Sequence, residues 1–94
     1  MNELYFALQD ILTRLKELAD DLKANPNVKF VRRIKILNLL MNLRSKRKAV
    51  RLSKLQLAKL QEKYRDIEYS KRMKLKDEYP ELINLIEEYI FPTI

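Results

Sequence analysis

The sequence predicts an all-α protein: a small antiparallel helical bundle of three long helices followed by a short C-terminal helix. Its 94 residues include no glycine, the residue that tight hairpin turns and positive φ angles usually require, so an all-β fold would lack its turns. Apolar residues make up 47% of the chain and recur at helical spacing, which suffices for one modest core. We therefore expect a single helical domain over residues 1–94.

The first helix is predicted over residues 3–24 by an apolar stripe. Steps of four and three residues separate the members of this stripe, which are Leu4, Leu8, Ile11, Leu15, Leu18 and Leu22. Charged residues fall mostly between these positions, so the helix is amphipathic and its apolar side needs another helix. Asn25, Pro26 and Asn27 end the helix, because the residue before a proline avoids the helical region.

The second helix, predicted over residues 27–49, carries two apolar stripes. The first stripe consists of Phe30, Ile34, Leu37 and Met41, and the second of Ile36, Leu40 and Leu43. The two stripes lie about 110° to 120° apart around the helix axis. A helix with two apolar sides contacts two neighbours. We therefore expect a central position, with the first helix on one flank and a later helix on the other.

The third helix is predicted to begin at Lys54 and to end near Lys76. Ser53 and Gln56 match a capping box, in which each side chain satisfies a backbone N–H of the other residue. Its buried stripe is expected to contain Leu57, Leu60, Tyr64 and Ile67. One unbroken helix over residues 27–76 is the alternative, because no glycine or proline interrupts this segment. We favour the turn before Ser53.

A short fourth helix is predicted over residues 81–91, between Pro80 and Pro92, and it is apolar enough to need a cover. Together with the stripe of the first helix, it supplies the residues that we expect at a protein interface. These are Leu4, Leu8, Ile11, Leu15, Leu82, Ile86, Tyr89 and Ile90.

Basic residues concentrate in the middle of the chain. The net charge is +7, and residues 22–61 contain twelve Lys and Arg but no Asp or Glu. Residues 44–54, RSKRKAVRLSK, are the densest part and are called the basic rim below. The expected nucleic-acid-binding residues are Arg32, Arg33, Lys35, Arg44, Lys46, Arg47, Lys48, Arg51 and Lys54. Such a cluster binds phosphates by releasing condensed counterions, without a sequence-specific motif.

These features predict a small basic protein that acts as a nucleic-acid-associated accessory factor. It would contact the phosphate backbone through the basic rim, as an accessory subunit of a replication or transcription assembly. The alternative is a protein-protein adaptor, or a self-associating bundle such as a homodimer, whose basic face docks on an acidic protein partner. An anionic membrane surface is the least favoured partner.

Enzymatic function is not expected. The chain has no His and no Cys, so the commonest general base, the thiol nucleophile and the soft metal ligands are all missing. Glu62 and Asp66 share a helix face, but the neighbouring cations favour a solvated ion-pair surface over a metal site. We expect no cofactor and no metal.

The longest apolar run, residues 36–43, is under half of the roughly 20 residues that span a bilayer, so we expect a cytoplasmic protein.

Overall fold

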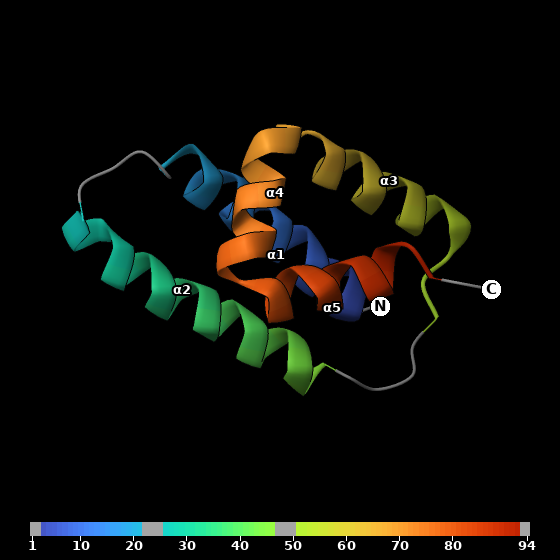
Figure 1. Ribbon diagram of the computed structural model, residues 1–94. Helices are drawn as coiled ribbons and strands as arrows, with labels where there is room; N and C mark the ends of the chain where they lie inside the picture. The colour runs from blue at the N-terminus through green and yellow to red at the C-terminus, as the bar shows by residue number, and fades with distance from the viewer. Residues whose placement is uncertain (1–2, 22–25, 47–50, 93–94) are drawn as a thin grey trace.

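The computed structural model describes residues 3–21, 26–46 and 51–92, except for the side chains of residues 26–28 (Figure 1). The described part of the chain is helical and contains no strand, so the all-α prediction is confirmed. Its five helices are α1 (Glu3–Asp20), α2 (Pro26–Ser45), α3 (Lys54–Arg65), α4 (Tyr69–Glu78) and α5 (Pro80–Ile90). The radius of gyration, 13.1 Å, is that of a compact globule of this length.

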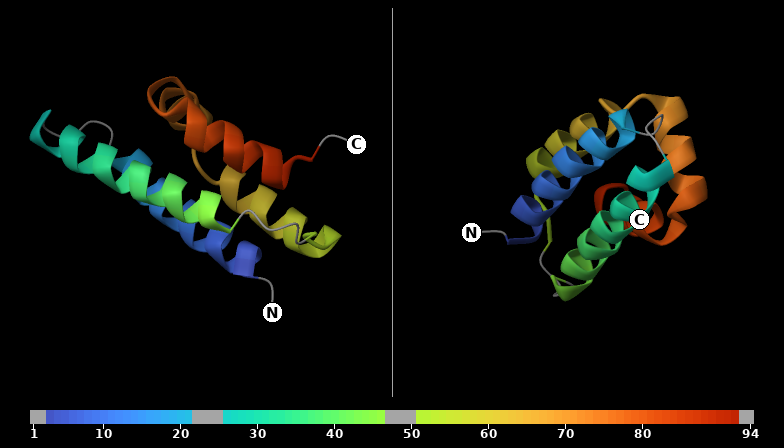
Figure 2. Two further views of the ribbon diagram at one scale, coloured as in Figure 1. Left: turned by 90° about the horizontal axis from the view of Figure 1, so that it is seen from below. Right: turned by 90° about the vertical axis from the view of Figure 1, so that its left-hand side faces the viewer.

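The helices α1, α2, α5 and α3 surround a common core, and each packs against the next. Figures 1 and 2 show that α1 and α3 run in one direction and that α2 and α5 run in the other. The short α4 crosses the end of this arrangement between α3 and α5 and also contacts α1. The chain therefore forms four roughly aligned helices, with a fifth that turns the chain at one end.

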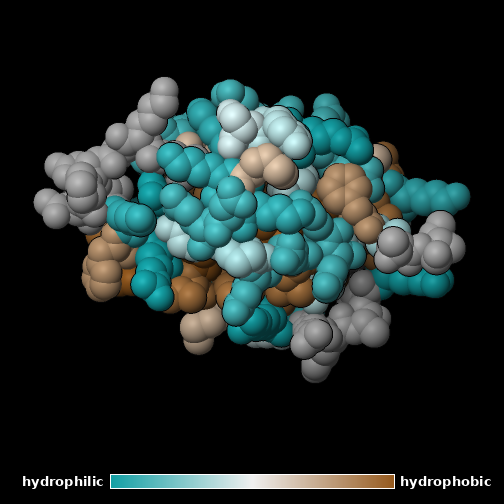
Figure 3. Space-filling model, in the orientation of Figure 1, coloured by the Kyte–Doolittle hydropathy of each residue, from teal (hydrophilic) through white to brown (hydrophobic). Residues whose placement is uncertain are grey.

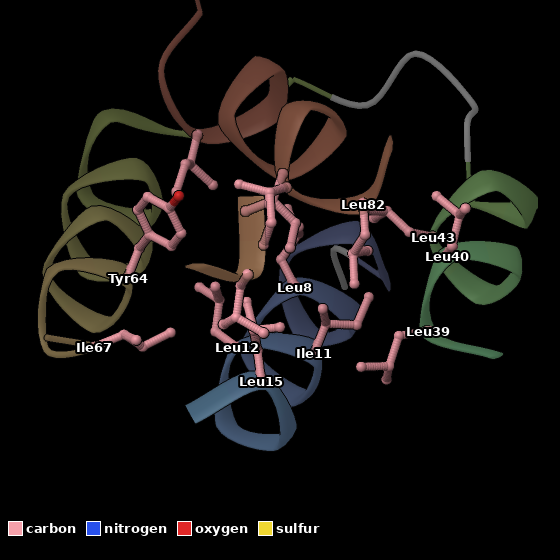
Figure 4. Close-up of a cluster of buried hydrophobic side chains, with 14 of the residues drawn as sticks. Leu8, Ile11, Leu12, Leu15, Leu39, Leu40, Leu43, Tyr64, Ile67 and Leu82 are labelled. Atoms are coloured by element: carbon pink, nitrogen blue, oxygen red, sulfur yellow. The ribbon is translucent and has the colours of Figure 1, made fainter. Parts of the chain in front are cut away.

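The core is built around α1, which packs against α2, α3 and α4. Leu8, Ile11 and Leu15 are fully buried, as the stripe of the first helix predicted, and Leu12, which was not part of that stripe, is fully buried as well. In Figure 4, Ile11 lies toward Leu39 of α2, whereas Leu12 lies on the side of α3 and α4. Both sides of α1 are therefore covered within the chain.

Helix α1 ends at Asp20, four residues before the predicted end, and Leu22 lies outside the described residues. The backbone N–H of Asp21 donates to the Leu18 carbonyl at 3.2 Å, a bond of the tight type that closes a helix. The Asp21 carbonyl accepts a hydrogen bond from Arg32 at 3.2 Å. A side chain of α2 therefore satisfies a backbone group that a longer helix would have paired itself.

The predicted helix over residues 54–76 is divided into α3 and α4, which is a correction to the sequence analysis. The predicted stripe ends at Ile67, and the next positions along it would be Lys71 and Lys74. A straight helix would carry these lysines along the core-facing side. The break after Arg65 instead lets Ile67 and Leu75 both become buried, while Lys71 reaches Asp20 at the end of α1 at 2.9 Å.

The predicted turn before α3 is confirmed, and the unbroken helix over residues 27–76 is excluded because α2 ends at Ser45. The Gln56 backbone N–H donates to Ser53 Oγ at 3.1 Å, and the Ser53 backbone N–H donates to Gln56 Oε1 at 3.0 Å. The predicted end of the second helix, at Ala49, lies outside the described residues. The capping box therefore fixes where α3 begins.

Replacing Ser53 with alanine is expected to lower the free energy of unfolding by about 1 kcal/mol, because the Gln56 N–H loses its acceptor at the start of α3. Urea denaturation followed by circular dichroism measures this change. The matched control is Ser45→Ala, since the Ser45 hydroxyl is exposed and only donates to the Asn42 carbonyl of its own helix. We expect this control to stay within about 0.5 kcal/mol of the wild type. Equal losses in the two variants would contradict the capping role of Ser53.

Candidate functional site

Helix α2 buries only one of its two apolar stripes. Ile36, Leu40 and Leu43 of the second stripe are at most 5% exposed and face the core. The first stripe points away from the core: Phe30 is 69% exposed, Ile34 44%, Leu37 48% and Met41 67%. The two expected neighbours are present, α1 and α5, but both lie on the inner side of α2. The expectation that both stripes of α2 would be covered is therefore wrong, because both neighbours pack on the same side of α2 and leave the first stripe exposed.

The exposed stripe forms a continuous apolar surface, which we call the α2 face and define as Phe30, Ile34, Leu37 and Met41. Their spacing of four, three and four residues places them along one side of the helix over about 16 Å. Figure 3 shows apolar side chains gathered along α2, at the lower left of the view. Large apolar side chains at a protein surface are usually dispersed, so a row of four is an uncommon surface feature.

A groove of about 680 Å³ lies beside the α2 face, between α2 and the junction of α4 with α5. Phe30, Leu37 and Leu40 line it from α2, and Pro80 and Leu82 line it from α5. The groove is open to solvent and largely apolar. Phe30 and Leu37 belong to both the α2 face and the groove, whereas Ile34 and Met41 lie outside the groove.

The two walls of the groove carry opposite charges. Lys29 and Arg33 lie on the α2 wall, and Glu78 and Glu81 lie on the opposite wall. Lys29 and Arg33 are exposed and form no ion pair with any described residue. Glu81, in contrast, is paired with Arg44 at 3.0 Å. The unpaired charge at this groove is therefore positive.

Arg32 is buried and contacts two residues that line the groove, Glu78 and Tyr79. It is 4% exposed, donates to the Tyr79 hydroxyl at 3.5 Å, and forms an ion pair with Glu78 at 3.6 Å. Its bond to the Asp21 carbonyl adds the end of α1 to the same group of contacts. Among the residues predicted to bind nucleic acid, Arg32 therefore differs from its exposed neighbours Arg33 and Lys35, because its guanidinium group is buried against Glu78, Tyr79 and the Asp21 carbonyl.

The basic rim is partly neutralised by acids of the same chain. Arg44 is paired with Glu81, and Lys46 lies 3.9 Å from Glu3. Exposed pairs of this kind contribute about 0 to 1 kcal/mol each, so they hold these cations only weakly. Arg51 and Lys54 are exposed and have no ion-pair partner in the described ranges, whereas Arg47 and Lys48 lie outside them. Lys35, on the far side of α2 from the groove, is also exposed.

The residues expected at a protein interface lie inside the molecule. Seven of the eight are buried, namely Leu4, Leu8, Ile11, Leu15, Leu82, Ile86 and Ile90, and Tyr89 is partly buried against the same core. Their contacts are with the core of the same chain, so these side chains form no exposed apolar surface. The α2 face is apolar as predicted, but its side chains are exposed and do not pack on a second neighbour. The cations Lys29 and Arg33 beside the stripe were the signal that this side of the helix meets solvent.

The titratable groups with shifted pKa values serve packing between helices. Burial, with a hydrogen bond to Glu87, raises the pKa of the Tyr64 hydroxyl between α3 and α5. The Lys71 ammonium group donates a hydrogen bond that lowers the pKa of the Asp20 carboxyl. Glu62 is exposed on α3, and Asp66 is exposed at the C-terminal end of that helix. The described residues contain no cluster of three groups able to hold a metal ion. None of these groups lines the groove.

Fold and site together define an all-α protein with an exposed apolar helix face beside a groove. Comparison with protein-family models, curated proteins and solved structures gave no match to this chain. Within the described ranges, no helix combines the length and the apolar character needed to cross a membrane.

Proposed function

We propose that the protein is a helical adaptor that docks on an acidic protein partner through its α2 face. The exposure of Phe30, Ile34, Leu37 and Met41 is the observation that supports this function best. These side chains are packed on one side only, and a partner that covers them removes the remaining apolar surface from water. Burial of the exposed half of each side chain is worth about 1 kcal/mol, before the costs of association are subtracted.

The sign of the partner's charge follows from the cations around the face. Lys29 and Arg33 project to solvent on the groove side of α2, Lys35 is exposed on the far side, and α2 contains no Asp or Glu. The whole chain adds a net charge of +7, which attracts acidic surfaces and repels basic ones. An acidic partner therefore gains both the apolar contact and a favourable encounter rate.

Nucleic-acid binding through the basic rim is the second candidate function. Arg51 and Lys54 support it, because they are exposed and free of ion pairs with described residues at one end of the molecule. This candidate includes the predicted role as an accessory subunit of a replication or transcription assembly. It makes no use of the α2 face, and for this reason it ranks second.

The adaptor function is tested by affinity capture from a cell extract with the full chain as bait. The double variant Phe30→Glu with Met41→Glu removes the apolar face. The control Phe6→Glu places a carboxylate at an exposed apolar residue of α1. We expect an acidic protein to bind the wild type and the control, and to bind the double variant at least tenfold more weakly once it is purified. Capture that is equal for all three baits would contradict the proposal.

The same proteins separate the adaptor from the second candidate. Binding to a labelled duplex and a labelled single strand is titrated with salt, and Arg51→Glu with Lys54→Glu is compared with the α2-face double variant. Binding that falls steeply with salt and is lost only in the basic-rim variant would favour the nucleic-acid function. A dimer that sediments intact and dissociates in the α2-face variant would replace the acidic partner with a second copy.

A further inference from the structure

We propose that the α2 face and its groove receive one amphipathic helix of the partner, with acidic side chains toward Lys29 and Arg33. This inference rests on the proposed adaptor function and specifies the segment that docks. Three features of the surface lead to it: its length, the groove beside it and the distribution of its charges.

The length and shape of the surface fit a helix. The α2 face extends over about 16 Å, which corresponds to three helical turns, and its 4-3-4 spacing is the pattern by which one helix packs along another. The groove beside it provides a second apolar wall from Pro80 and Leu82. A helix of about 11 to 14 residues therefore contacts the α5 wall together with Phe30 and Leu37, the two residues of the α2 face that line the groove, and Ile34 and Met41 extend the apolar contact outside it.

The charges fix which side of the docking helix is acidic. Glu81 accepts a hydrogen bond from Arg44 at 3.0 Å, and Glu78 lies 3.6 Å from Arg32 without a hydrogen bond, so each acid of the groove has a cationic neighbour. Lys29 and Arg33 have no such partner among the described residues. A carboxylate on the docking helix would form an ion pair with Lys29 or Arg33, whereas a cation at the same place would be repelled by both.

A second copy of the chain fits the surface less well. Because α2 contains no Asp or Glu, a paired α2 brings no carboxylate to Lys29 and Arg33. In an antiparallel pair, moreover, the cations of both helices lie on the same side of the seam and repel one another. A membrane surface also fits poorly, since the groove is hollow and its far wall would turn Glu78 and Glu81 toward anionic lipid.

The test uses a displayed library of helical peptides of about 14 residues, selected against the full chain. Every member carries leucines at the 4-3-4 spacing, and the positions on both flanks of the leucines are random. We expect Asp and Glu to be enriched on one flank only. We also expect Leu37→Glu to abolish binding of the selected peptides.

Charge reversal identifies the contact. Arg33→Glu should weaken binding of a selected peptide at least tenfold, and replacing the acidic residues of that peptide with lysine should restore it. The matched control is Arg51→Glu, which changes the net charge equally at an exposed site outside the groove, and it should change the affinity less than threefold. Equal weakening by both variants would show attraction to net charge alone and overturn the proposal.

Other outcomes also overturn it. These are selected flanks without acidic enrichment, peptides that still bind the Leu37→Glu variant, and α2-dependent binding to phosphatidylserine vesicles in place of peptides. Failure here is distinct from failure of the adaptor function. If affinity capture yields a partner that depends on the α2 face but docks with a loop or strand, the function stands and this inference falls.

Discussion

Replacing Leu43 with alanine will lower the free energy of unfolding by about 3 kcal/mol, whereas the same replacement at Leu37 will lower it by less than about 1 kcal/mol. Both leucines lie on α2, so the change in helix propensity is nearly the same. They differ in burial, because Leu43 is fully enclosed between α2 and its neighbours while Leu37 is 48% exposed. Leu43→Ala leaves a cavity, and Leu37→Ala leaves a surface that water fills.

Urea denaturation of the two variants measures this difference directly, and the slope of the transition verifies that both unfold in a two-state manner. The comparison also tests the orientation of α2, on which the docking surface depends. Equal losses of stability, or a larger loss for Leu37→Ala, would show that the first stripe is buried and would remove the α2 face.

Replacing Arg32 with alanine will lower the free energy of unfolding by about 2 to 3 kcal/mol, whereas Arg33→Ala will remain within about 0.5 kcal/mol of the wild type. These neighbours in sequence have opposite environments. Arg32 contacts Glu78, the Tyr79 hydroxyl and the Asp21 carbonyl from a buried position, and its removal leaves these groups without their cation. Arg33 is exposed at the groove and contacts no acid in the described part.

Thermal and urea unfolding of the two variants, compared with the wild type, decides between these environments. The same proteins give a second measurement: Arg33→Ala should reduce binding of an acidic helical peptide while leaving the fold intact. If Arg33→Ala were the more destabilising change, the assignment of Arg32 to the interior would be incorrect.

Local features of the fold were predictable from the sequence because they depend on neighbouring residues. The Ser53 and Gln56 capping box and the stripe of α1 are short-range patterns, and both are present in the structure. The break between α3 and α4 was not predicted, because no glycine or proline marks it. It follows from the need to bury both Ile67 and Leu75, which is a property of the packed core.

The candidate site was harder to predict because it depends on which apolar surfaces remain uncovered. The stripes of α2 look alike in sequence, and only the placement of α1 and α5 leaves Phe30 and Met41 exposed. The positions of Lys and Arg in the sequence likewise do not show which cations are exposed. They selected Arg32 and Arg33 together, although one is a structural residue inside the molecule and the other lies at its surface.

The packing of α1 also affects the order in which the protein can assemble during synthesis. Helix α1 is made first, yet it packs against α3 and α4, which begin at Lys54 and Tyr69. While the ribosome has completed only α1 and α2, the side of α1 that carries Leu12 has no cover (Figure 4). Most of the chain must therefore leave the ribosome before this core closes, and until then the nascent chain exposes apolar residues that favour aggregation.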